Sequence, residues 1–162
     1  MNSGKGGLNP RLYNSALKLL SIRAHGTEEL RRKLLNKGDA GDVEAVLAEL
    51  LRKKYLDDQE FACQRARSAC LHKRWGSLRI SQDLKNLGLD DRIVGLSLEK
   101  ALAEFPEEER LARVISNYQK LYGRPTSIKD MKKLFDHCLR LGYAAEMVRP
   151  RLESLFSSLS WD

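Results

Sequence analysis

The sequence reads Tyr55-Leu56-Asp57-Asp58-Gln59-Glu60-Phe61-Ala62, and fifty positions later it reads Phe105-Pro106-Glu107-Glu108-Glu109-Arg110-Leu111-Ala112. The register around these blocks holds without a gap, and it pairs Gly26 with Gly76, Thr27 with Ser77, Leu30 with Ile80, Leu34 with Leu84, Gly38 with Gly88 and Val43 with Ile93. Repeats at such a period indicate units that cannot bury a core alone and must stack. We therefore expect an array of units rather than an enzyme built around one pocket.

The helical period of 3.6 runs through nearly all of the chain, and no segment shows sustained strand alternation. We predict an all-α fold of three tandem three-helix repeats that form an elongated curved array. The first repeat covers residues 11–57, the second 58–106 and the third 107–162, after a flexible N-terminus at 1–10.

Caps and breaks divide each predicted unit into helices. Thr27 and Ser77 are predicted to cap the second helices of the first two units, and Asp42 to cap a third helix. Gly38 is expected to be the C′ residue of the second helix in the first unit, and Gly88 to close the corresponding helix in the second. The second unit is expected to begin with one helix over residues 59–74.

The third unit departs from this register. Gly142 lies 54 positions after its counterpart Gly88, which indicates an insertion of about four residues. Gly123-Arg124-Pro125 is expected to end the first helix of this unit. Pro150 falls inside the last predicted helix, residues 144–159, and should kink or split it.

Composition restricts the class of protein and its partners. The 162 residues are 42% hydrophobic and carry a formal net charge of +7, so nucleic acid, acidic protein and acidic lipid all suit the sign. No apolar run approaches the roughly 20 residues of a membrane span. The start lacks the apolar core of a signal peptide, and the three cysteines, Cys63, Cys70 and Cys138, form no CxxC pair. We expect a cytoplasmic protein without a membrane segment.

Candidate catalytic and ligand groups have simpler interpretations. The acidic residues Asp57-Asp58 and Glu107-Glu108-Glu109 stand where carboxylates cap helix N-termini. The histidines share no metal-ligand spacing. Gly4-Lys5-Gly6-Gly7 lacks the spacing of a phosphate-binding loop and fits a flexible terminus. We expect no catalytic residue, no cofactor and no metal.

A basic segment at residues 65–85 is the best functional lead. The segment contains six basic residues and one acidic residue, Asp83, so it carries +5 of the total charge of +7. Arg67 and Arg74 should lie opposite the core face of their helix, with Leu71 between them. Because arginine and tryptophan are favoured interface anchors, we predict a contact surface formed by Arg65, Arg67, Leu71, Lys73, Arg74, Trp75, Arg79 and Lys85. The alternative is a solvated charged face on which Leu71 packs against the neighbouring unit.

Smaller basic clusters lie in the other two units. They contribute Arg31, Arg32, Lys132 and Lys133 as further candidate contacts. Each of these clusters is also compatible with a solvated helix face. No zinc-finger spacing, RNP aromatic motif or basic-zipper heptad is present, so sequence-specific reading of DNA is not expected.

Several blocks together resemble the RecX family of bacterial recombination regulators. These blocks are residues 17–23 and 28–34, the stretch Tyr55-Leu56-Asp57-Asp58-Gln59-Glu60-Phe61-Ala62, then Arg79-Ile80-Ser81-Gln82-Asp83-Leu84 with Leu87-Gly88-Leu89, and Leu141-Gly142-Tyr143 in the third unit. The likeness covers about residues 11–159, and its motifs are clearest in the first two units. It singles out Arg79 as a motif arginine that can make a contact.

The resemblance implies a regulator of RecA recombinase. Such a protein lies along the groove of the RecA filament on single-stranded DNA and inhibits ATP hydrolysis and strand exchange, which modulates homologous recombination and DNA repair. It has three tandem three-helix repeats and no catalytic residues, and we expect a monomer, with single- or double-stranded DNA as a further candidate partner. The alternative is a basic helical protein that competes for single-stranded DNA, although few aromatic residues besides Trp75 and Trp161 are candidates to stack on bases.

Overall fold

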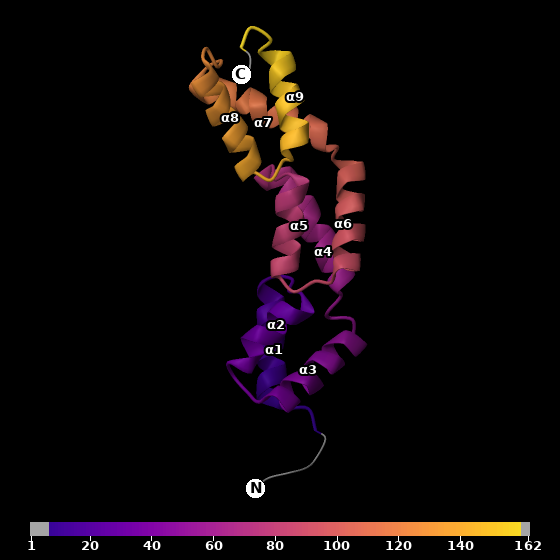
Figure 1. The fold of residues 1–162 in the computed structure, drawn as a ribbon. Coiled ribbons are helices and arrows are strands. Elements are labelled where there is room, and N and C mark those ends of the chain that lie inside the picture. Colours follow the sequence, from indigo (N-terminus) through magenta and orange to yellow (C-terminus); the bar gives the residue numbers. More distant parts are fainter. Residues whose placement is uncertain (1–6, 160–162) are drawn as a thin grey trace.

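The computed structural model describes residues 7–159, and every regular element in that range is helical. Figure 1 shows these elements stacked along one long, gently curved axis, with α1 to α3 at one end and α7 to α9 at the other. The predicted all-α array of three-helix units is therefore confirmed, while the residue boundaries of the units stay predictions. Residues 1–6, which hold most of the Gly4-Lys5-Gly6-Gly7 stretch and of the predicted flexible terminus, lie outside the described residues, as does Trp161.

The first unit is built from α1 (Pro10–Ile22), α2 (Thr27–Leu35) and α3 (Ala40–Arg52). Each helix turns an apolar stripe toward the other two. The stripes meet in one cluster made of Leu12, Ala16, Leu30, Leu34, Val43, Val46, Leu47 and Leu50, which Leu56 joins from the connection after α3.

The second unit contains α4 (Asp58–Ser68), the π-helical turn η1 (Ala69–Lys73), α5 (Ser77–Asn86) and α6 (Asp91–Glu104). Its own core consists of Phe61, Ala62, Ala66, Ala69, Cys70, Ile80, Leu84, Leu89, Val94 and Ala101. A hydrophobic cluster separate from that of the first unit is what a stack of repeats requires.

The predicted single helix over residues 59–74 is wrong in its second half. The α-helical pattern stops at Ser68, and Ala69–Lys73 form a wider π-helical turn. Arg74 then takes a left-handed backbone conformation with φ 56° and ψ 30°. The amide of Trp75 donates to the carbonyl oxygen of Ala69 at 3.3 Å and closes the turn. This local geometry changes the directions in which the side chains after Ser68 point.

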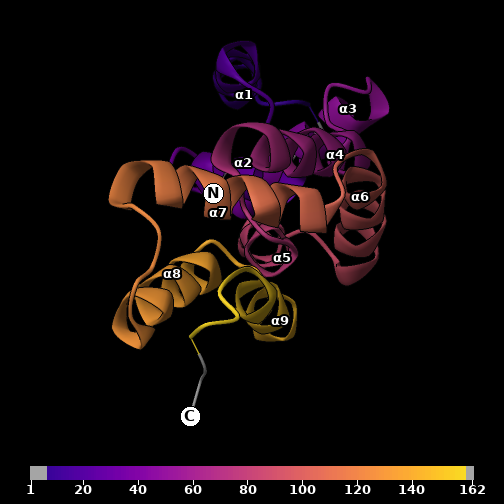
Figure 2. The same cartoon turned by 90° about the horizontal axis from the view of Figure 1, so that it is seen from above.

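The third unit consists of α7 (Glu107–Tyr122), α8 (Ile128–Arg140) and α9 (Ala145–Leu155). Figure 2 shows α8 and α9 on the same side of α7. Their core contains Leu111, Val114, Ile115, Met131, Leu134, Cys138, Tyr143, Val148, Leu152 and Phe156. No helix within residues 7–159 is long and apolar enough to cross a membrane.

Pro150 does not split the last helix, so that part of the expectation is wrong, while the kink stays a prediction. The helix α9 runs through Pro150 and ends at Leu155 rather than at residue 159. Buried Val148 and Leu152 flank the proline and anchor both halves of the helix in the core. Packing of these side chains offsets the loss of one backbone hydrogen bond.

The insertion in the third unit is shared between a loop and a helix. The first helical stretch has the same span in both units, residues 58–73 and 107–122. The following connection grows from residues 74–76 to 123–127. The next helix grows from 10 residues in α5 to 13 in α8.

Thr27 and Ser77 are not N-caps, contrary to the prediction. The N-cap residues are Gly26 and Gly76, which have no capping side chain, and the helices begin one residue later. The amide of Thr27 donates to Asp58 Oδ1 at 2.7 Å, and the amide of Ser77 donates to Glu107 Oε1 at 2.6 Å. The carboxylate that caps the second helix of the first and second units therefore comes from the start of the following unit.

Two further predictions of helix ends are also wrong. The N-cap of α3 is Asp39, whose side chain accepts from the amide of Asp42 at 3.0 Å. Gly38 has no positive φ, so it does not take the left-handed conformation of a C′ glycine. A Cβ there would lie 2.5 Å from Leu12 Cδ1, so the absence of a side chain allows Leu12 to pack closely against it. Gly88 does take the left-handed conformation expected after a helix, with φ 81°.

Candidate interaction surface

Salt bridges offset half of the cations in the basic segment at residues 65–85. They join Arg65 to Asp83 at 2.8 Å, Arg67 to Glu104 at 2.6 Å and Lys85 to Asp91 at 3.0 Å. The hydrogen bonds with Asp83 raise the pKa of Arg65 above its usual value. Two of the three acids lie outside the segment, so its surface carries a smaller charge excess than its sequence does.

Two of the other three cations of the segment, Lys73 and Arg79, lie over Trp75. Lys73 Nζ lies 4.2 Å and Arg79 Cζ 4.4 Å from the centroid of the half-buried indole ring. Both distances are within the range of cation–π attraction. Leu71, four residues before Trp75 in the chain, is 48% exposed. We call Leu71, Lys73, Trp75 and Arg79 the Trp75 cluster.

The π-helical turn and the left-handed Arg74 position this cluster. Arg74 is exposed, and its carbonyl oxygen accepts a hydrogen bond from the hydroxyl of Tyr143 at 3.0 Å. A left-handed arginine is an uncommon backbone state that the surrounding structure must hold. The sequence gives no signal for the turn, because its five residues follow the same helical pattern as those before them.

Arg79 lies at the junction between the second and third units. Its Nη1 donates to the carbonyl oxygen of Arg140 at 3.0 Å, at the end of α8. Gly142 packs against it, since a Cβ on that glycine would lie 2.3 Å from the Cβ of Arg79. The side chain of Arg79 therefore joins two units and also contacts the face of Trp75.

The basic residues predicted in the first and third units are scattered. Arg31 pairs with Glu28 and with Glu44, and Arg32 donates to the carbonyl oxygen of Asn86 at 3.3 Å. Lys133 pairs with Asp130 at 3.3 Å, and Lys132 is exposed on α8. The structure does not bring these four residues together with the Trp75 cluster into one compact site.

Two of the predicted contact residues, Leu71 and Arg74, lie beside cations of the third unit. They line a cavity of about 370 Å³ together with Arg110, Arg113 and Lys120 of α7. These three residues were not among the contact residues predicted from the sequence, although the sequence contains a pattern that groups them. Positions 110, 113, 117 and 120 recur at helical spacing and fall on one stripe of α7.

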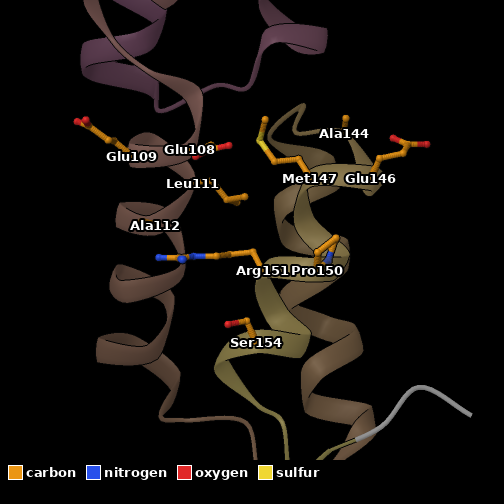
Figure 3. Close-up of a pocket in the computed structure, with 10 residues that line it drawn as sticks. All are labelled: Glu108, Glu109, Leu111, Ala112, Ala144, Glu146, Met147, Pro150, Arg151 and Ser154. Carbon is orange, nitrogen blue, oxygen red and sulfur yellow. The ribbon is translucent and has the colours of Figure 1, made fainter.

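A larger cavity lies elsewhere, between α7 and α9. It has a volume of about 860 Å³, and Figure 3 shows Glu108 and Leu111 of α7 across from Met147 and Glu146 of the α9 side, with Arg151 extended between the two helices. None of the contact residues predicted from the sequence lines this cavity.

Buried thiols are poorly suited to chemistry here. Burial raises the pKa of Cys138 to about 12 and raises that of Cys70 above its usual value. Both remain protonated near neutral pH, and a protonated thiol is a weak nucleophile and metal ligand. Within residues 7–159, no group of three or more His, Cys, Asp or Glu side chains could hold a metal ion.

The fold defines a tandem three-helix repeat protein, and comparisons with known proteins identify its family. The family model for the first three-helix domain of RecX matches residues 13–50, and that for the second matches residues 57–96. The chain is 37% identical over 108 residues to the regulatory protein RecX of Pelodictyon phaeoclathratiforme, covering 64% of this chain and 68% of that protein. It is 32% identical over 138 residues to the regulatory protein RecX of Mycolicibacterium smegmatis, covering 83% and 73%.

The chain belongs to the RecX family of regulatory proteins. Its fold is also that of a solved family structure, RecX from Lactobacillus salivarius. The two superpose with a TM-score of 0.74 over 90% of this chain and 95% of the other, at 19% sequence identity.

Proposed function

We propose that this protein binds RecA recombinase filaments on single-stranded DNA and inhibits their ATP hydrolysis and strand exchange, so that it modulates recombination and DNA repair in the cytoplasm. Membership in a family of regulatory proteins supports this role. The elongated stack of units supports it too, because such arrays offer a long surface to an extended partner.

The Trp75 cluster is the observation that carries the proposal. It consists of the Trp75 ring with two cations over it, and of the half-exposed Leu71 four residues earlier in the chain. Within residues 7–159, Lys73, Arg74 and Arg79 form no salt bridge. Their charge therefore remains available to DNA phosphates or to acidic groups of the filament.

Charge reversal at Lys73 of the Trp75 cluster and at the adjacent exposed Arg74 tests the proposal. The double variant Lys73→Glu, Arg74→Glu should raise the concentration needed for half inhibition of the DNA-dependent ATPase of RecA by at least about tenfold, as expected when contact cations are reversed. The matched control is Arg92→Glu, Lys100→Glu, which reverses two exposed charges on α6. Helical content, followed by circular dichroism, should be the same in both.

Filament length measured in the same titration separates two modes of action. A fall in ATPase on filaments of constant length indicates binding in the groove, and shortened filaments indicate disassembly. Inhibition by the Lys73→Glu, Arg74→Glu variant at wild-type concentrations would contradict the role of this surface.

The second candidate function is competition for single-stranded DNA. The unpaired cations that line the cavity beside α7, together with Tyr122 at 73% exposure, favour it. Binding to bare single strands should then weaken steeply with salt, because phosphate contacts release counterions. Inhibition of RecA should disappear when the strand is in large excess over both proteins.

A further inference from the structure

A cationic cavity lies between the end of the first helical stretch of the second unit and α7 of the third. Its volume is about 370 Å³. Leu71 and Arg74 come from the π-helical turn and its end, and Arg110, Arg113 and Lys120 come from α7. The size falls within the range of small-ligand sites, roughly 300–1,000 Å³.

The charges that line this cavity are all positive. Arg74, Arg110, Arg113 and Lys120 contribute four cations, and no carboxylate lines the cavity. Within the part of the chain that the structure describes, none of the four forms a salt bridge. This distinguishes them from Arg65 and Arg67, which are paired. Four cations around one concave space produce a positive potential that attracts an anion.

Arg110 is the buried member of the group. Arg110 is only 6% exposed, and its Nε donates to the carbonyl oxygen of Phe105 at 3.0 Å. Its Nη1 donates to the carbonyl oxygen of Trp75. Its Nη2 is buried and has no hydrogen-bond partner within residues 7–159. A buried guanidinium without a carboxylate partner is costly, and an anion in the adjoining cavity would offset that cost.

We propose that this cavity binds a phosphoryl group. A phosphoryl group carries up to about two negative charges and three strong acceptor oxygens, which suits several cations better than a single carboxylate does. The guanidinium forks of Arg74 and Arg113 match phosphate geometry. Ser116 and Asn117 also line the cavity and supply neutral donors. This assignment deepens the second candidate function, which uses the same cavity, and is independent of the proposed binding to a filament.

The phosphoryl group has two possible sources, a nucleotide strand and free phosphate. A second cavity of about 200 Å³ shares Arg74 and Asn117 with the first and is lined by Tyr118, Tyr122 and His137. The rings of Tyr118 and Tyr122 have centroids 4.7 Å apart. A nucleotide can place its base on such aromatic side chains, whereas free phosphate gains nothing from them.

Phosphate binding to the purified full chain tests the proposal. Sodium phosphate should raise the midpoint of thermal unfolding in a saturable manner, compared with sodium chloride at equal ionic strength. In the variant Arg113→Gln, Lys120→Gln, the dissociation constant for phosphate should rise at least about tenfold, as the loss of two charge-assisted contacts predicts. The matched control Arg92→Gln, Lys100→Gln, which removes two charges from α6, should stay within about twofold of the wild type.

Arg110→Lys tests the buried cation separately, because the substitution keeps the positive charge but removes the forked guanidinium group. It should bind phosphate more weakly than the wild type by about tenfold or more. Stabilisation by phosphate no greater than that by chloride, or equal weakening in the α6 control, would overturn the proposal. RecA is absent from this assay, so a negative result for phosphate binding would not contradict the filament proposal. A negative result for filament binding would likewise not contradict phosphate binding.

Thymidine 5′-monophosphate and a short oligothymidylate distinguish the sources. Affinity at least about tenfold above that for inorganic phosphate, lost in Tyr122→Ala, assigns the site to a nucleotide strand. Equal affinity for all three probes assigns it to free phosphate. Either result supports a phosphoryl site, and binding of the oligothymidylate that survives in Arg113→Gln, Lys120→Gln would count against this cavity.

Discussion

The hydroxyl of Tyr143 donates a hydrogen bond of 3.0 Å to the carbonyl oxygen of Arg74, 69 residues earlier in the chain. Tyr143 is 1% exposed in the core of the third unit, whereas Arg74 is the left-handed residue that ends the π-helical turn of the second. Burial raises the pKa of Tyr143 to about 12, so its hydroxyl remains a donor near neutral pH. The third unit thereby fixes the backbone from which the Trp75 cluster and the cationic cavity extend.

Removal of this hydroxyl should loosen the junction between the two units. We expect Tyr143→Phe to lower the free energy of unfolding by about 1–2 kcal/mol, because the carbonyl of Arg74 loses its partner while the ring is retained. Urea denaturation measures this change. Tyr55→Phe, at a position 56% exposed, should change stability by less than about 0.5 kcal/mol. Equal values for the two variants would show that the inter-unit hydrogen bond contributes little.

The cap that Glu107 supplies to α5 should also couple the units. Its Oε1 accepts from the amide of Ser77 at 2.6 Å, so Glu107→Ala should cost about 1 kcal/mol or more of stability. Glu109→Ala is the matched control, since Glu109 stands in the same first turn of α7 and is exposed. Amide hydrogen exchange at the start of α5 should accelerate in Glu107→Ala and not in Glu109→Ala.

Two glycine substitutions should act in opposite directions. Gly142 has φ 92°, and a Cβ on it would lie 2.5 Å from the backbone nitrogen of Arg79, so Gly142→Ala should destabilise the protein by at least about 2 kcal/mol. Gly95 lies inside α6, and a Cβ there would meet no atom within 4 Å. Gly95→Ala should therefore stabilise the protein by about 0.5–1 kcal/mol. Thermal melts of both variants check the signs.

His25 should resist protonation in the folded protein. Its Nδ1 lies 2.9 Å from the carbonyl oxygen of Arg23, and its Nε2 lies 2.9 Å from the ammonium of Lys33. Burial lowers the pKa of His25 below the usual 6.5. The charges of Arg23 and Lys33 act in the same direction, while the backbone hydrogen bond and Glu29 oppose them.

The pH dependence follows from this direction. Because the unfolded chain binds a proton at His25 more readily than the folded one, the contribution of this residue to stability is complete above pH 6.5 and falls as the pH drops below it. Histidine proton shifts in an NMR titration should report a pKa below 6.5 for His25. A value at or above 6.5 would contradict the arrangement of Lys33 and His25 seen here.

Much of the fold could be predicted from the sequence, because helical periodicity and the fifty-residue register are local signals. Leu30, Leu34, Ile80 and Leu84 are buried as their spacing predicts. Helix ends were harder to place. Thr27 and Ser77 have the residue types of caps, but the capping oxygens come from Asp58 and Glu107, which only the stacking of units brings close.

The candidate surface shows the same division. The sequence showed that residues 65–85 are basic, but the acids that neutralise Arg67 and Lys85 lie at the two ends of α6 and could not be paired with them in advance. The four cations of the cavity come from two units, so their proximity depends on how those units stack. Their residue types could be read from the sequence, but their common environment could not.

The sequence by itself determined the helical class, the three-unit order and the family, since these depend on local periodicity and on a repeated pattern of apolar residues. Only the tertiary structure decided which cations remain unpaired, where the π-helical turn directs Arg74 and its neighbours, and which carboxylate caps which helix. These properties depend on contacts between residues about 30 to 70 positions apart, whose geometry is set by packing between units rather than by local preference.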